Sequence, residues 1–116
     1  MHELSLCEDL MDQVMAIAKA HHAKKVVCIT VRIGPLSGIE PLLLESAFLI
    51  SRADTLAEDA EFITENLPIC VLCHDCDIES EATVNNLVCG NCDSYNTSLV
   101  SGDELILARV ELENAD

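Results

Sequence analysis

Four cysteines in two pairs are the residues of this chain best suited to chemistry. Each pair has the pattern Cys-x-x-Cys, with Cys73 and Cys76 in the first and Cys89 and Cys92 in the second. Two cysteines at this spacing on a tight turn can direct both sulfurs at one ion, and two such turns complete a tetrahedron. Four soft thiolates in a closed tetrahedron favour a structural zinc ion. Gly90, inside the second pair, is expected to give that turn a backbone conformation that other residues resist.

The same cysteines have other interpretations, namely a rubredoxin-type iron site, a redox dithiol or thiols without a metal. A thioredoxin-type redox motif would be single and would lie at a helix start. Cys70 repeats the spacing before Cys73, but a tetrahedral site has no fifth position, so we interpret Cys70 as a free thiol. We expect Cys7 and Cys28 to be buried thiols. We expect His74 to face solvent or to hydrogen-bond beside the site rather than bind the metal.

The opening residues Met1, His2 and Glu3 offer a second set of donors, all of them nitrogens. A bulky second residue generally prevents removal of the initiator methionine, so we expect the α-amine to belong to Met1. The amine, the His2 amide and the His2 Nδ1 can close two chelate rings, and the Glu3 amide supplies a fourth nitrogen. A square plane of nitrogens selects Ni(II) or Cu(II) over zinc. From these residues alone, a solvated polar terminus is the other interpretation.

Charge and composition exclude several classes of function. The formal net charge is −15, and an acidic surface repels phosphate backbones, so we expect no nucleic-acid partner. Residues 68–101 contain no Lys or Arg and one aromatic residue, Tyr95. No segment approaches the ~18 apolar residues of a membrane span, and the first residues do not resemble a signal peptide. We therefore expect a cytoplasmic protein without membrane association, in which cysteines bind metal rather than form disulfides.

The elements that must position these residues follow from hydrophobic periodicity. Apolar residues at helical spacing predict helices, and β-branched or alternating runs predict strands. In the last strand, Ile106, Ala108, Val110 and Leu112 alternate with Leu107, Arg109 and Glu111. The expected elements are a helix over 4–20, a strand over 25–33, a helix over 40–53, a strand near 60–66 and a strand over 104–112.

The cysteine-rich segment interrupts these elements. It holds five of the seven cysteines and too few periodic apolar residues for a core of its own. The predicted fold class is therefore α+β, a small three-stranded sheet with two helices, interrupted by an inserted zinc-ribbon-like domain. We predict one α+β domain of residues 1–67 and 102–116, and a zinc-binding domain of residues 68–101.

The chain resembles the HypA/HybF family of nickel metallochaperones over essentially its whole length. The resemblance rests on residues 1–6, residues 33–41, the four paired cysteines and residues 101–105. It implies that the α+β domain binds Ni(II) through His2, with the Met1 amine and the backbone around His2 and Glu3. Glu3 matches a residue whose side chain supports that site and partner docking. It also implies the zinc ligands, which are Cys73, Cys76, Cys89 and Cys92.

The family function is implied in the same way. The protein would take up Ni(II) transiently, work with a HypB-type GTPase and deliver the ion to the immature large subunit of [NiFe]-hydrogenase. Glu40 occupies a position where some relatives carry an acidic residue near the nickel. Asp77 and Asp93 stand where some relatives carry a histidine and change their zinc coordination with pH, so we do not expect that response here.

Two rival functions come from other classes. One is a zinc-ribbon protein-interaction module without nickel transfer, and the other is a thiol oxidoreductase with a reactive low-pKa thiol. Nothing in the chain resembles a catalytic triad, a phosphate loop or a carboxylate pair for acid–base work, so we expect no enzymatic activity. We expect a monomer or a weak homodimer.

Overall fold

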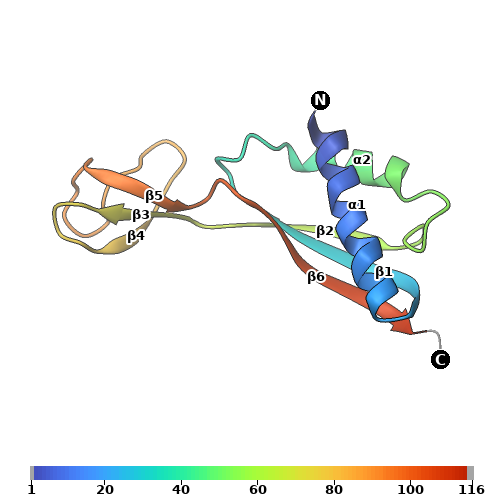
Figure 1. The fold of residues 1–116 in the computed structure, drawn as a ribbon. Coiled ribbons are helices and arrows are strands. Elements are labelled where there is room, and N and C mark those ends of the chain that lie inside the picture. Colours follow the sequence, from blue (N-terminus) through green and yellow to red (C-terminus); the bar gives the residue numbers. More distant parts are fainter. Residues whose placement is uncertain (1, 115–116) are drawn as a thin grey trace. The chain divides into compact units, whose positions relative to one another are not determined.

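The computed structural model describes residues 2–114, with the side chain of His2 left out. The chain divides into two compact units (Figure 1). The first takes in Met1–Val31, Glu40–Glu65 and Ile106–Asp116, and the second takes in Arg32–Ile39 and Asn66–Leu105. The elements are α1 (His2–Ala20), β1 (Ala23–Ile33), α2 (Pro41–Ser51), β2 (Glu61–Asn66), β3 (Ile69–Cys73), β4 (Glu79–Ala82), β5 (Thr97–Ser101) and β6 (Leu105–Asn114).

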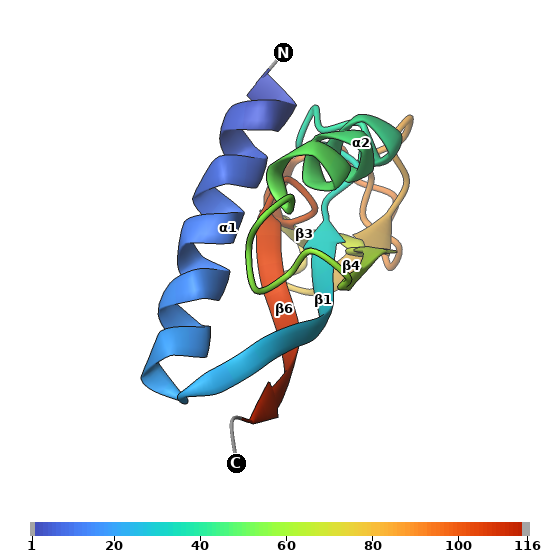
Figure 2. The same cartoon turned by 90° about the vertical axis from the view of Figure 1, so that its right-hand side faces the viewer.

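The first unit is built on a three-stranded sheet in the order β2-β1-β6. The central strand β1 buries Val26, Ile29 and Val31, whose branched side chains suit a pleated surface covered by helices. α2 connects β1 to its neighbour β2, α1 packs against α2, and Figure 2 shows α1 lying along β1 and β6. The predicted α+β class, with three strands and two helices in this part, is confirmed.

α1 is an amphipathic helix whose buried stripe faces the rest of the first unit. The acidic residues Glu8, Asp9 and Asp12 lie on its exposed surface. The helix therefore contributes one apolar stripe to the core and one acidic face to the solvent. Neither helix within residues 2–114 combines the length and the apolarity needed to cross a membrane. The buried stripe consists of Cys7, Leu10, Met11, Val14 and Ala18.

α2 begins at Pro41, directly after the capping residue Glu40. The Glu40 carboxylate accepts a hydrogen bond from Leu42 N at 3.3 Å, and proline at the first helical position needs no partner for a backbone N–H. Phe48 stacks on Phe62 of β2 with ring centroids 4.6 Å apart. These contacts fix α2 over the β2 side of the sheet.

The last strand differs in one respect from its sequence pattern. Leu105 and Leu107 are half-buried while Ile106 is exposed, and farther along Val110 and Leu112 are half-buried. The inward-facing phase therefore changes between Leu107 and Val110. The prediction that Ile106 and Ala108 face the same side as Val110 was wrong. Ala108 and Arg109 are both exposed, and this shift of one residue places the side chains before it on the opposite face.

The second unit contains a smaller sheet in the order β4-β3-β5. β3 pairs antiparallel with both neighbours, and its register with β5 shifts between Cys70 and Val71. Besides residues 66–105, this unit includes the segment 32–39. The predicted limits of an inserted zinc-binding domain, residues 68–101, stay a prediction.

Two chain segments of the second unit approach each other closely at Gly34 and Gly102. Gly34 N donates to Glu104 O and Leu36 N donates to Gly102 O, both at 2.8 Å. A Cβ atom added at Gly34 would lie 2.2 Å from Gly102 O and 2.7 Å from Asp103 N. Only glycine at position 34 allows these two hydrogen bonds to form together.

We expect Gly34→Ala to destabilise the protein by about 3 kcal/mol or more, because the added methyl group must displace the Gly102 backbone. Gly38→Ala is the matched control. Gly38 has φ +78 but nothing within 4 Å of an added Cβ, so only left-handed strain of about 1–2 kcal/mol is expected. Urea unfolding of the zinc-loaded proteins measures both losses. Equal losses would contradict the close approach.

Candidate metal centres

The four paired cysteines come from three parts of the second unit. Cys73 is the last residue of β3, and Cys76 follows it in the turn that leads to β4. Cys89 and Cys92 lie in the connection between β4 and β5. Because β4 and β5 flank β3 in the sheet, the two turns return to the same place.

Each cysteine pair is shaped by a backbone hydrogen bond and a left-handed residue. Asp77 N donates to Cys73 O at 2.9 Å, and Asp93 N donates to Cys89 O at 3.0 Å. Asp77 has φ 58 and Asp93 has φ 62, a region that aspartate tolerates better than most side chains. The two aspartates therefore close equivalent turns, one for each pair.

Gly90 has a different role from the one its position predicted. Gly90 does not have a positive φ, unlike Gly38 and Gly102. The prediction that it supplies an unusual backbone conformation was therefore wrong. A Cβ atom at Gly90 would lie 3.3 Å from Ser80 Cβ, and Gly90 N donates to Ser80 Oγ at 2.9 Å. Its small size lets the second turn approach β4.

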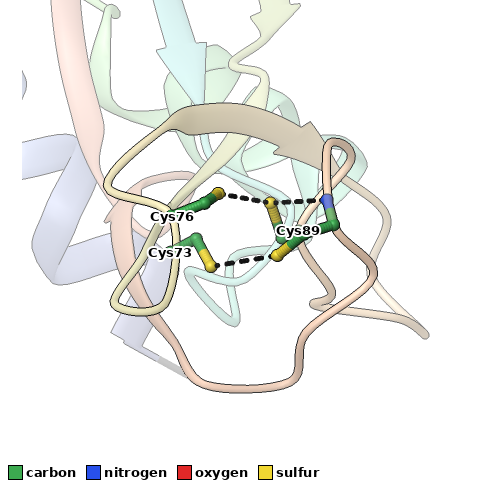
Figure 3. A group of neighbouring side chains, drawn as sticks. Cys73, Cys76 and Cys89 are labelled. Atoms are coloured by element: carbon green, nitrogen blue, oxygen red, sulfur yellow. Dashed lines mark hydrogen bonds between the residues drawn. The ribbon is translucent and has the colours of Figure 1, made fainter.

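The structure brings the four sulfurs together (Figure 3). All four Sγ atoms lie within 4.8 Å of one another. Cys73 Sγ lies 3.6 Å from Cys92 Sγ, and Cys76 Sγ lies 3.6 Å from Cys89 Sγ. A tetrahedron with Zn–S bonds of about 2.3 Å has edges of about 3.8 Å, so the cluster fits a four-sulfur zinc site.

Backbone N–H groups prepare these sulfurs for a metal. Cys92 N and Asn91 N donate to Cys89 Sγ at 3.4 and 3.3 Å. They stabilise the thiolate and lower the pKa of the Cys89 thiol to about 6. On the first turn, Asp75 N donates to Cys73 Sγ at 3.3 Å. The thiolate is the form that binds metal, so the two N–H groups of the second turn favour the liganding state of Cys89.

A polar network outside the sulfurs joins the two turns. Asp75 Oδ2 accepts from Ser94 Oγ, and Asp75 Oδ1 accepts from Asn96 Nδ2 at 3.2 Å. The hydrogen bonds from Ser94 and Asn96 lower the pKa of the Asp75 carboxyl. His74 is exposed, and its Nε2 lies within hydrogen-bond distance of Ser98 Oγ. Sequence reasoning missed Asp75, because polar residues in a loop have no spacing that marks them as partners.

The other three cysteines do not join the cluster. Burial alternates along β3, where Cys70 is half-buried and Cys73 is buried. The two side chains therefore point to opposite faces of the sheet. Cys7 and Cys28 are buried, as predicted, and burial raises the pKa of both thiols. All three therefore differ from the paired cysteines in position.

The predicted nickel donors fall mostly outside the described residues. Met1 and the His2 side chain are not among the described residues, so nickel binding by the Met1 amine and the His2 imidazole remains a prediction. α1 begins at His2, and the first N–H groups of a helix point out of its end. Glu3 is only 8 % exposed, and its Oε2 accepts from Glu40 N at 3.4 Å. The structure thus brings Glu3 and Glu40 together, joining the starts of α1 and α2.

Comparison with known proteins identifies the family. A family model described as hydrogenase/urease nickel incorporation, metallochaperone, hypA matches residues 1–112. This chain belongs to that family. It is 46% identical over 112 residues to the hydrogenase maturation factor HypA of Nitrosospira multiformis, covering 97% of each chain. It is 42% identical to the HypA of Aquifex aeolicus, covering 97% of this chain and 98% of the relative.

The fold agrees with solved structures of HypA-family proteins. The solution structure of the Ni metallochaperone HypA from Helicobacter pylori superposes with a TM-score of 0.74 at 28% identity. The alignment covers 98% of this chain and 99% of that one. The predicted resemblance to this family is therefore confirmed. A zinc-ribbon interaction module without nickel transfer is not favoured, because the family model spans both compact units.

We expect Cys73→Ser and Cys89→Ser each to lose the zinc, since a serine hydroxyl cannot replace a thiolate in a four-sulfur site. Cys70→Ser is the matched control, because Cys70 lies three residues from Cys73 but outside the cluster. Metal analysis of purified proteins measures zinc per chain. Full zinc in Cys73→Ser, or lost zinc in Cys70→Ser, would contradict the assignment.

Zinc retention should also depend on pH. Zinc displaces the thiol protons, so falling pH weakens binding. The pKa of the Cys92 thiol is raised to about 12 beside the other sulfurs, so protons compete for Cys92 already at neutral pH. The pKa of the Cys89 thiol is lowered to about 6, so protons compete for Cys89 only in acid. We expect slow transfer of zinc to a chromogenic chelator near neutral pH and rapid transfer below about pH 6. Complete transfer at neutral pH, or none in strong acid, would oppose this account.

Proposed function

We propose that this protein is a nickel metallochaperone that binds Ni(II) at its N-terminus and delivers it to the immature large subunit of a [NiFe]-hydrogenase. The observation that carries the proposal is the family match over residues 1–112, which takes in both the opening Met1-His2-Glu3 and the four paired cysteines. The family description names hydrogenase and urease. We choose hydrogenase because the curated relatives are named hydrogenase maturation factors.

The nickel ion is cargo, and its proposed donors are four nitrogens. They are the Met1 amine, the amide and imidazole of His2 and the amide of Glu3. A square plane of nitrogens suits Ni(II) and excludes zinc, which prefers a tetrahedron. Deprotonated amides bind only while the metal is present, so the ion can be released to a partner when protons or competing ligands arrive.

The Glu3 carboxylate has a separate role in this proposal. Its hydrogen bond with Glu40 N holds the start of α1 against the start of α2, while the Glu3 backbone amide contributes to the nickel plane. In this proposal Glu40 is not a nickel ligand but caps the start of α2. The side chains at both positions would therefore orient the site without touching the ion.

Zinc is proposed as the resident, structural metal of the second unit. Cys73, Cys76, Cys89 and Cys92 would hold it in a closed site, where it contributes folding free energy and leaves no position for substrate. The spacing of their sulfurs supports this choice. Redox chemistry at the pairs is a weaker alternative, because a bound zinc occupies all four thiolates.

The proposed partners follow from the delivery step. A HypB-type GTPase and the precursor of the hydrogenase large subunit would meet the chain in the cytoplasm, with the chain acting as a monomer or weak homodimer. The role requires no nucleic acid, no membrane and no catalysis by the chain itself.

Nickel titration of the untagged protein tests the proposal. We expect His2→Ala to abolish stoichiometric binding, since it removes the imidazole, and one residue added before Met1 to do the same by moving the amine. Glu3→Gln keeps the backbone amide and should weaken nickel binding less than His2→Ala does. Zinc content serves as the control and should stay unchanged in all three. Undiminished nickel binding in both His2→Ala and the extended protein would sink the N-terminal site.

A further inference from the structure

α2 carries large apolar residues on two sides, yet the chain covers only one of them. Its buried side chains are Leu44, Ala47 and Phe48. The side turned away from the core carries large apolar residues that are 53 % to 71 % exposed. A surface helix normally turns polar residues to solvent, so several exposed large apolar residues on one helix indicate a surface that a partner covers. The exposed residues are Leu42, Leu43, Leu49 and Ile50.

The exposed side of α2 borders a groove that α1 completes. One hollow of about 200 Å³ is lined by Leu4, Leu43, Ala47 and Ile50 among others. A second, of about 500 Å³, lies beside it and shares Leu4 and Ile50 as lining residues. The two hollows therefore form one continuous surface, which we call the α1–α2 groove.

The second hollow brings flexible side chains to the groove. The half-buried Met15 lines it together with Leu4 and Ile50, and the buried core residue Met11 forms part of its wall. Methionine has an unbranched, polarizable side chain that adapts to partners of different shape. The groove thus combines exposed branched residues, which can anchor a partner, with Met15, whose side chain can adjust to it.

The charges around the groove are all of one sign. Glu3 lines the first hollow, and Glu8 and Asp12 line the second. No Lys or Arg is among the lining residues of either hollow. A second copy of this chain, docked symmetrically, would place these carboxylates against one another, which is unfavourable when their charges are desolvated. Charge complementarity favours a basic partner.

We propose that the α1–α2 groove docks an amphipathic helix of a partner protein, with leucine-like anchors on one face and Lys or Arg on its flanks. A groove between two helices accepts a third helix, and anchors spaced i, i+3, i+4 and i+7 would follow it. Glu3 at one end is the neighbour of His2, so a docked partner lies beside the proposed nickel donors. The link between this docking and nickel delivery rests on the proposed function.

The test uses a fluorescent helical peptide built of leucine and lysine, with leucine at the four anchor spacings. Binding is followed by fluorescence anisotropy at physiological salt. We expect Leu43→Asn and Ile50→Asn each to weaken binding about tenfold, as buried interface anchors do. Val84→Asn is the matched control, because Val84 is 52 % exposed but lies in the second unit. It should change binding less than about twofold.

Two peptide controls separate the groove from general attraction to an acidic protein. A peptide of the same composition with its leucines spread around the helix should bind weakly, and so should one with glutamate in place of lysine. Equal binding of the scrambled peptide, or equal loss in Val84→Asn, would overturn the proposal. So would sedimentation that shows a stable homodimer abolished by Ile50→Asn.

Nickel binding keeps this test independent of the proposed function. His2→Ala should lose nickel and keep the peptide, whereas Ile50→Asn should keep nickel and lose the peptide. If His2→Ala keeps its nickel, the N-terminal nickel site is refuted. If Ile50→Asn keeps its affinity for the peptide, the groove is refuted. Far-UV circular dichroism confirms that each variant is folded.

Discussion

The second unit depends on holding four cysteine sulfurs at the corners of one tetrahedron, with the sulfurs of the two cross-turn pairs 3.6 Å apart. Its strands are short, and between residues 66 and 105 its buried apolar side chains are Ile69, Val71, Cys73 and Cys89. So few residues do not stabilise a fold by burial alone. Four thiolates this close repel one another unless a cation lies between them. In the proposed function a zinc ion supplies the stabilisation that so small a core does not, and the turns at Asp77 and Asp93 hold the sulfurs for it.

The first unit does not depend on a metal for its fold. Its sheet and helices bury a conventional core, so the metal proposed at its N-terminus need not hold the fold together. An ion bound by an amine, an imidazole and two amides at a chain end can leave without unfolding anything. The two proposed metal sites thus differ for a physical reason: a closed thiolate site would retain its ion, whereas an open nitrogen site beside the proposed groove would pass its ion on.

The sequence predicted the elements that carry long periodic signals. Both helices and the three strands of the larger sheet were predicted, because their apolar residues repeat over many positions. β3, β4 and β5 were not predicted, since short strands around a metal need little alternation. The left-handed conformations at Asp77 and Asp93 were missed because glycine is the usual sign of them. We predicted one apolar stripe for α2, whereas Leu43 and Ile50, outside that stripe, are exposed and line the proposed groove. Sequence shows that such residues are apolar but not that they stay uncovered.

X-ray absorption of the protein loaded with both metals distinguishes the two proposed sites, because it reports the ligands of each metal separately. We expect a zinc spectrum with four sulfur neighbours at about 2.3 Å and a nickel spectrum with nitrogen or oxygen neighbours and no sulfur. Nickel with sulfur ligands, or zinc with fewer than four sulfurs in the native protein, would contradict two separate sites with separate tasks.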